Sequence, residues 1–152
     1  MVNDTINAIG NLEVKLLNSD GQLIEKRDIK NTVVHVGKGY ITDRMKQNTA
    51  PIMSVMAIGN GNVAATTSQV LLSGEKARVA FDSSTVTNNT ITYVATFGAG
   101  VPLGGATVAE AGIFNSGNTT SNTGTMLCRT RFNEVNKGNS DIIVITWNVT
   151  IQ

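Results

Sequence analysis

The sequence predicts an all-β protein, built as a single antiparallel β-sandwich or barrel with one short helix near residues 36–47. Composition is the first reason: Thr occurs 19 times, Val 16 times and Ile 13 times, and these β-branched side chains favour strands. Asn and Gly, with 17 and 15 residues, suit the tight turns that join short strands. Alternating apolar stretches are also separated by turn signals roughly every 8 to 15 residues.

The length of the chain suits one domain. A chain of 152 residues and 16.1 kDa leaves little room for a second hydrophobic core. Residues 1–11 are polar and carry few large apolar side chains, so we expect them to form an N-terminal arm. Residues 12–152 are expected to form the single β-sandwich domain.

A charged hairpin is expected directly after the arm. Apolar and charged residues alternate from Leu12 to Leu16, which is the period of a strand. Asp20-Gly21 is a strong hairpin signal. The returning strand, residues 22–30, is so rich in charge that we expect it at an edge of the sheet, where charge discourages unwanted pairing.

One segment has a helical period. Apolar residues between Val33 and Lys46 recur at helical spacing, with polar residues on the opposite face. Gly37 and Gly39 weaken its beginning, so the firmest helical part is residues 39–47. The apolar run 52–58 that follows predicts a short buried strand.

The second half of the chain predicts more strands. Residues 77–81 and 91–97 alternate, which predicts a hairpin around a polar turn at 82–89. From Ile143 to Ile151 every second residue is apolar, with Trp147 at the centre, and this is the clearest strand pattern in the chain. Further strands are expected at residues 107–114 and 125–132, with an exposed and mobile loop at 115–124 and a connection at 133–140.

Composition and charge exclude several classes of protein. With one Cys and one His, a single chain has neither a disulfide framework nor a Cys/His zinc site. The net charge of +1 does not favour nucleic acid or an anionic membrane as a partner. No secretion signal or membrane-spanning segment is recognisable, and a lone cysteine suits assembly in a reducing cytoplasm.

The nucleophilic and glycine-rich candidates favour packing over chemistry. His35 lies between two valines with no partner at motif spacing, so we expect a half-buried packing residue. Cys128 alternates with apolar neighbours in a strand and is expected to behave as a small buried hydrophobe. Gly37-Lys38-Gly39 and Gly59-Asn60-Gly61 resemble fragments of phosphate-binding loops, but neither completes a motif, and turns are expected.

The charged and aromatic candidates are also weighed against simpler roles. Glu75, Asp82 and Glu110 are the carboxylates available for sugar hydrolysis, and we expect them to be solvated loop residues instead. No enzyme activity is expected, and no catalytic, cofactor or metal site is assigned. Arg129, Arg131 and Lys137 form a small basic cluster, which is too small to favour nucleic acid. For the aromatic residues Trp147, Tyr40 and Tyr93, core packing is expected over sugar stacking.

The order of motifs in the C-terminal half resembles a group of small virion proteins of tailed bacteriophages. The motifs are a Glu-x-Gly-hydrophobic-Phe turn at residues 110–114, a Leu-x-Arg-x-x-Phe strand at 127–132, Lys137, and a closing Ile-Thr-Trp-x-Val-x-Ile strand at 145–151. Residues 30–37, Ile58–Gly61 and the positions of Leu72 and Arg78 extend the resemblance to about two thirds of the chain. It is firmest over residues 76–152.

This resemblance implies a structural role. Gly112 would allow a tight bend, and Phe114, Phe132 and Trp147 would fill the core. Proteins of this kind are usually head decoration proteins or tail and baseplate components. The expected function is therefore a capsid decoration or cement protein in the virion, with the major capsid protein and other virion proteins as partners, a homo-oligomeric state, and no cofactor, nucleic acid or membrane. The alternatives are a tail, baseplate or fibre-adaptor component, or a module that binds host glycans.

Overall fold

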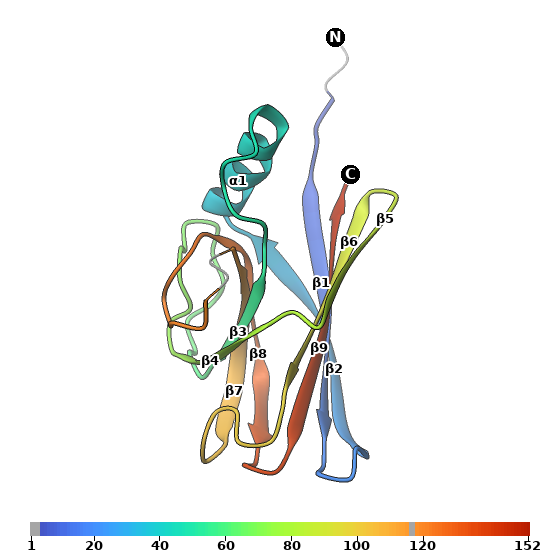
Figure 1. Ribbon diagram of the computed structural model, residues 1–152, viewed down its shortest axis with the longest axis vertical. Coiled ribbons are helices and arrows are strands. Elements are labelled where there is room, and N and C mark those ends of the chain that lie inside the picture. The colour runs from blue at the N-terminus through green and yellow to red at the C-terminus, as the bar shows by residue number, and fades with distance from the viewer. Residues whose placement is uncertain (1–3, 116–117) are drawn as a thin grey trace.

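The computed structural model describes residues 4–115 and 118–152, and this part of the chain forms a curled antiparallel sheet with a single helix (Figure 1). The elements in chain order are β1 (Ala8–Leu17), β2 (Leu23–Val33), α1 (His35–Lys46), β3 (Val55–Gly59), β4 (Glu75–Ala80), β5 (Ser83–Thr87), β6 (Thr90–Phe97), β7 (Ala106–Phe114), β8 (Met126–Lys137) and β9 (Ile142–Ile151). The predicted all-β class with one short helix is confirmed.

The sheet is a half-barrel with two walls. Its strand order is β4-β3-β7-β8-β2-β1-β9-β6-β5, and every neighbouring pair is antiparallel. β4, β3, β7 and β8 form one wall, and β2, β1, β9, β6 and β5 form the other (Figure 1). Among the described residues, strand pairing joins the two walls at one place, where Thr32 and Val33 of β2 pair with Arg129 and Cys128 of β8. This short seam lets the sheet fold over on itself.

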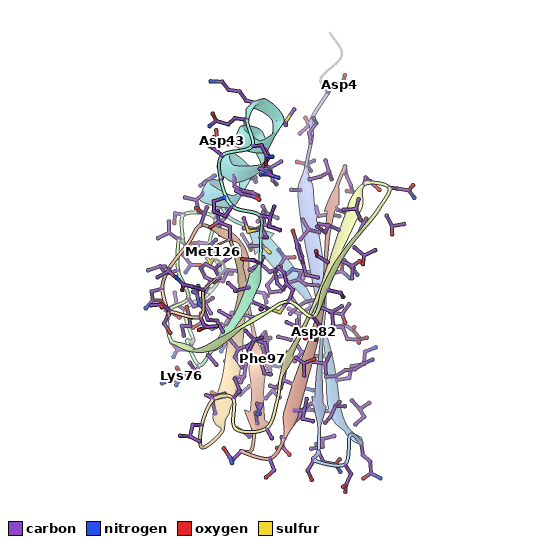
Figure 2. All side chains as sticks on the ribbon, viewed as in Figure 1. Asp4, Asp43, Lys76, Asp82, Phe97 and Met126 are labelled. Carbon is purple, nitrogen blue, oxygen red and sulfur yellow. The ribbon has the colours of Figure 1, made fainter. Side chains whose placement is uncertain are left out.

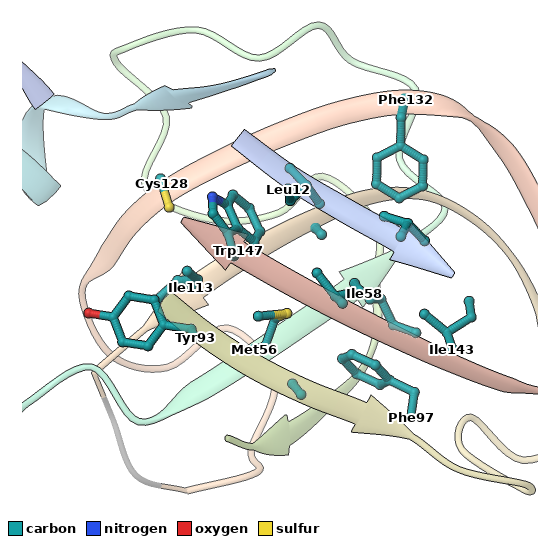
Figure 3. Close-up of a cluster of buried hydrophobic side chains, with 14 of the residues drawn as sticks. Leu12, Met56, Ile58, Tyr93, Phe97, Ile113, Cys128, Phe132, Ile143 and Trp147 are labelled. Atoms are coloured by element: carbon teal, nitrogen blue, oxygen red, sulfur yellow. The ribbon is translucent and has the colours of Figure 1, made fainter. Parts of the chain in front are cut away.

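The main core fills the space between the two walls. Trp147, Ile143 and Ile145 extend from β9 and meet Ile58 and Ile113 of the opposite wall within one cluster of buried side chains (Figure 3). Along β9 every second residue from Ile143 to Val149 is buried, as the alternation predicts. Burying these large apolar side chains is the main favourable contribution to folding.

A second, smaller core lies on the outer face of the β3–β7–β8 wall. It is formed by Val34, Val55, Ala57, Leu72, Phe114 and Met126. Leu72 belongs to the connection between β3 and β4, so a loop covers this face of the sheet. With apolar contacts on both sides, all five residues of β3 are buried, which explains why this segment reads as a continuous apolar run instead of an alternation.

The helix occupies the predicted place. α1 covers His35–Lys46, against the expected 36–47, and Arg44 and Lys46 lie in its last turn, where positive charge is favourable. Gly37 is buried in the first turn of α1. A Cβ at this position would lie 2.1 Å from the carbonyl oxygen of Leu127, so a larger residue would clash. The absence of a side chain therefore lets the first turn of α1 lie directly on β8.

The expected N-terminal arm is shorter in the structure. Residues 8–11 belong to β1 and pair with β9, and Gly10 and Asn11 also pair with β2. The backbone of Asn7 also exchanges two hydrogen bonds with Gln152. Within the expected arm, residues 4–6 are the described residues that lie outside the sheet. The few apolar side chains gave no sign of this, because backbone pairing with β9 and Gln152 holds the segment.

Two other expectations need correction. The polar stretch expected as a turn at 82–89 contains an edge strand, β5, and its hairpin partner is β6; β4 pairs with β3. The real turn is Asn88-Asn89, where Asn88 has a φ of 54°. β8 continues through the expected connection to Lys137. Both segments are polar because they lie at exposed parts of the sheet, which sequence alternation alone does not distinguish from a loop.

We predict that Trp147→Ala lowers the free energy of unfolding by about 3–5 kcal/mol, because the indole is completely buried between the walls and its removal leaves a cavity. Trp147→Phe should cost clearly less, since it keeps an aromatic ring and removes an indole N–H that has no hydrogen-bond partner within the described residues. Urea unfolding followed by far-ultraviolet circular dichroism measures both. Equal losses for the two variants would contradict the packing argument.

Candidate functional site

A buried ion pair occupies the centre of the outer face of the β7–β8 wall. Glu110 extends from β7 and Arg129 from β8, and both side chains are 0% exposed. Nη2 and Nε of Arg129 donate to Oε2 of Glu110 at 2.6 and 3.0 Å. The backbone pairing sets Arg129 opposite Gly112, two residues from Glu110, so both side chains lie on the same face of the sheet.

The remaining hydrogen-bonding capacity of the Glu110 carboxylate is taken by the β3–β4 loop. Backbone N–H groups of Gly61, Ser73 and Gly74 donate to it at 3.0, 3.0 and 2.6 Å, and the Ser73 hydroxyl donates at 3.2 Å. A Cβ at Gly61 would lie 2.3 Å from Oε1 of Glu110. The Gly59-Asn60-Gly61 motif is therefore needed for close approach to an anion, and that anion is a carboxylate of the same chain.

Arg129 binds the same loop from its other side. Its Nη1 donates to Oε1 of Gln69 at 2.8 Å, and its Nη2 donates to the carbonyl of Val63 at 2.9 Å and to the Ser73 hydroxyl at 3.2 Å. Glu110 and Arg129 thus fasten both ends and the middle of residues 60–74 to the sheet. This fastening holds Leu72 over the second core.

A second buried ion pair holds the β7–β8 loop in the same way. Arg78 of β4 makes a bidentate contact with Glu75, with Nε to Oε1 at 2.6 Å and Nη2 to Oε2 at 2.8 Å. The backbone N–H of Asn122 donates to Glu75, and Arg78 donates to the carbonyl of Thr123. The Arg78 guanidinium also lies 4.4 Å from the ring centroid of Phe114, a cation–π contact over the second core.

The ion pair keeps Glu110 charged. Burial by itself would raise the pKa of the Glu110 carboxyl, but the hydrogen bonds from Arg129 and from the backbone of Ser73 and Gly74 outweigh burial, so the pKa lies below its usual value of 4.5. A carboxylate that is ionised and surrounded by donors is well suited to holding structure, because it has no lone pair left for proton transfer.

The three carboxylates considered for sugar hydrolysis have three different partners. Glu75 and Glu110 each bind their own arginine, and the expectation that they are solvated is wrong because both side chains are buried. Asp82 is exposed, as expected, and accepts a hydrogen bond from the Thr96 hydroxyl at 2.7 Å. Both buried carboxylates lie on strands, Glu75 on β4 and Glu110 on β7.

The expected basic cluster is also absent from this arrangement. Arg129 is buried with Glu110, Arg131 is exposed, and Lys137 is buried at the end of β8 with its Nζ donating to the carbonyl of Gly98 at 3.0 Å. Burial lowers the pKa of Lys137, although the nearby Asp141 carboxylate opposes this effect. Only Arg131 of the three side chains presents its charge to solvent.

The expectation for His35 is wrong. It is exposed at the first position of α1, where its backbone N–H donates to the carbonyl of Thr67. The valines on either side suggested burial, but the change from strand to helix at this point turns the imidazole outward. Gly37-Lys38-Gly39 lies within α1, so its glycines belong to a helix that packs on β8 and not to an expected turn.

The core residues were assigned correctly. Cys128 is completely buried, and burial raises the pKa of its thiol, so the group stays protonated and packs as a small hydrophobe. Trp147 and Tyr93 are buried in the main core, where burial raises the pKa of the Tyr93 phenol, and Tyr40 packs against that core (Figure 3). Phe114 and Phe132 are buried as the resemblance implies. Gly112, by contrast, lies within β7 and not in a turn; its missing side chain makes room for Leu72 and Phe114.

An apolar groove opens at the end of the molecule that carries α1. It consists of two adjoining cavities of about 330 and 460 Å³ that share Ile41 and Ile151. We call it the α1 groove, and its principal apolar residues are Ile6, Ala8, Tyr40, Ile41, Met45, Val86, Ile91 and Ile151. Met45 is 80% exposed and Val86 70% exposed. Asp4 and Asp43 lie at the same end, on the N-terminal segment and on α1 (Figure 2). Exposed apolar surface of this kind is typical of protein-binding sites.

Within residues 4–115 and 118–152, no three side chains of the His, Cys, Asp and Glu type gather as metal ligands would. In the same part of the chain, no helix has both the length and the apolar character needed to cross a membrane. No family model, curated protein or solved structure matches the chain.

We predict that Glu110→Gln lowers the free energy of unfolding by about 3–5 kcal/mol, because it leaves the Arg129 guanidinium buried without its counter-charge. The control is Glu13→Gln, which removes a partly exposed carboxylate that also binds two lysines and should cost no more than about 1 kcal/mol. Urea unfolding of both variants measures the difference. Similar small losses would show that the pair does not hold the loop.

We also predict a specific dependence of stability on pH. Because the pKa of Glu110 is lower in the folded protein than in the unfolded chain, its contribution is complete above about pH 4.5 and is lost as the pH falls through the lower folded value. Unfolding midpoints of the wild type and Glu110→Gln should therefore approach each other below pH 4.5. Curves that stay parallel from pH 7 to pH 3 would contradict the lowered pKa.

Proposed function

We propose that this protein is a structural component of a tailed-bacteriophage virion, a capsid decoration or cement protein that binds the outside of the head. It would brace neighbouring capsid subunits against the pressure of the packaged DNA. Each copy needs only a modest interface, because contacts to several subunits act together as multivalent binding. Its activity is therefore binding, without a catalytic step.

The observation that carries the proposal is the position of the residues on which the phage resemblance rests. Glu110 and Arg129 form the buried ion pair, and the missing side chain of Gly112 leaves room for Leu72 and Phe114. Phe114 belongs to the second core and Trp147 to the main core. The resembling motifs thus coincide with the residues that hold this half-barrel together, which supports a shared scaffold and not a chance likeness of turns.

The α1 groove supports an attachment surface at one end of the molecule. The N-terminal segment, the end of β9 and α1 meet there, and the described residues 4–6 extend past the sheet beside them (Figure 1). Ile6 of this segment is exposed and lines the groove together with Met45. A capsid subunit that presents an apolar segment would cover these side chains, and the extended segment beside the groove would add contacts to the same subunit.

The resemblance also includes tail and baseplate components, which makes a tail location the second candidate. Copy number in purified particles separates the two: hundreds of copies indicate the head, and about a dozen indicate the tail. For the third candidate, a glycan-binding module, Trp147 and Tyr93 offer no stacking surface because both are buried.

We predict that Met45→Asp weakens binding to heads assembled without this protein by at least tenfold, a loss of about 1.4 kcal/mol. Met45 lies on the rim of the α1 groove, and a charge there would have to be desolvated on docking. The matched control is Leu103→Asp, a change at another apolar side chain, 90% exposed, in the β6–β7 loop at the other end of the molecule (Figure 1). Co-sedimentation with heads measures both.

Deletion of residues 1–6 is a second test of the same surface. It leaves Asn7 and β1 in the sheet, so we expect a folded domain with weakened head binding. Equal binding by Met45→Asp, Leu103→Asp and the wild type would remove the α1 groove from the proposal. Failure of the wild type to bind heads at all would favour the tail.

A further inference from the structure

The free edge at β5 lacks the charges found at other free positions of this sheet. β5 is the last strand of its wall, and residues 83–87 are all exposed. From Ser83 to Tyr93 the chain carries no charged side chain. Thr and Val at three of the five β5 positions favour extended structure. The strand therefore presents unpaired backbone groups and no charged side chain of its own; the exposed Asp82 just before it accepts a hydrogen bond from the Thr96 hydroxyl.

The other free edges are protected. Most of β2 has no partner on one side, and residues 25–30 include five charged side chains. β4, at the opposite end of the sheet, carries Glu75, Lys76 and Arg78, and the β7–β8 loop binds two of these. Charged side chains on edge strands are a common way in which proteins prevent edge-to-edge association. Of these edges, β5 is the one without charged side chains, which favours pairing of β5 with another strand.

We propose that β5 pairs with β5 of a second copy of this chain, antiparallel, about a two-fold axis at Thr85. In this register Thr85 lies opposite Thr85, Ser84 opposite Val86, and Ser83 opposite Thr87. No charged groups meet, and hydroxyl side chains face one another at two kinds of position, which is favourable across antiparallel strands. The proposal is independent of the proposed function.

The identity of the partner follows from the geometry of the strand. A two-fold contact uses the same patch on both copies, so a short neutral strand is complementary to itself without any second surface. Directly opposite residues lie on the same face of a sheet, so the concave faces of the two half-barrels would continue into one another. Val86 is 70% exposed at the rim of the α1 groove. In the dimer it would lie within a continuous sheet that spans both copies, and no longer at a free edge.

The expected dimer is weak in solution. Five residues from each copy bury far less than the roughly 800 Å² per partner of a standard interface. Copies held on one surface would pair more readily, because their effective concentration is high. A test must therefore trap the contact and must distinguish it from random collision.

The test is oxidative cross-linking of single-cysteine substitutions in the full chain. Thr85→Cys places two thiols opposite each other at the axis, within reach of a disulfide. The matched control is Thr87→Cys, on the same strand and the same face and also exposed, whose two thiols would lie four residues apart, about 13 Å. The native Cys128 is buried and serves as the background in the wild type.

We expect Thr85→Cys to form covalent dimer at least tenfold faster than Thr87→Cys, with circular dichroism of both variants like that of the wild type. Thr85→Lys, measured by sedimentation equilibrium, should weaken self-association at least tenfold because it opposes two like charges. Equal rates for the two cysteine variants, or faster cross-linking of Thr87→Cys, would overturn the proposed pairing. A chain that stays monomeric and unlinked would also overturn it and would leave the edge to a strand of another protein.

Discussion

The buried contact between Glu110 and Arg129 determines how the outer face of this half-barrel is closed. Neither charge is stable alone in a dry interior, and each is satisfied only when residues 60–74 lie against the sheet. The β3–β4 loop therefore has one favourable position, although it contains little regular structure. Leu72 is carried into the second core by that position, so an electrostatic contact and an apolar contact depend on each other.

The two ion pairs solve the same problem at two places. The β4-β3-β7-β8 wall needs cover on its outer face, and the chain provides loops where many proteins provide a helix. Loop backbone has polar groups that must be satisfied when it is buried. Glu110 and Glu75 accept hydrogen bonds from these N–H groups, and Arg129 and Arg78 donate to the carbonyls. Each arginine–glutamate pair thus satisfies backbone groups of a loop that, in a regular sheet, a neighbouring strand would satisfy.

Sequence patterns predicted the parts of the fold that repeat with a period, and they missed the parts that depend on distant partners. The alternation around Trp147 and the helical spacing before Lys46 are local, and both elements lie where expected. β5 was missed because an edge strand exposed on both faces has no apolar alternation. The role of Glu110 depends on glycines 36 and 49 residues away in the chain. The available signal was the Gly-x-Gly turn, which lacks the rest of a phosphate-binding motif. Its backbone N–H groups can still bind an anion, and a carboxylate of the same chain can be that anion.

The division of charge over the surface connects the scaffold to its proposed use. The free side of β2 carries exposed ionic groups, so two copies meeting there would have to desolvate charge, and at the β4 edge the β7–β8 loop binds Glu75 and Arg78. The α1 groove and β5 are adjacent, since Val86 belongs to both, and neither is guarded in this way. Association is therefore directed to one end and one edge of the molecule. A protein that is displayed in many copies benefits from this restriction, because an unguarded second edge would allow open-ended polymers, whereas a single two-fold edge stops at a pair.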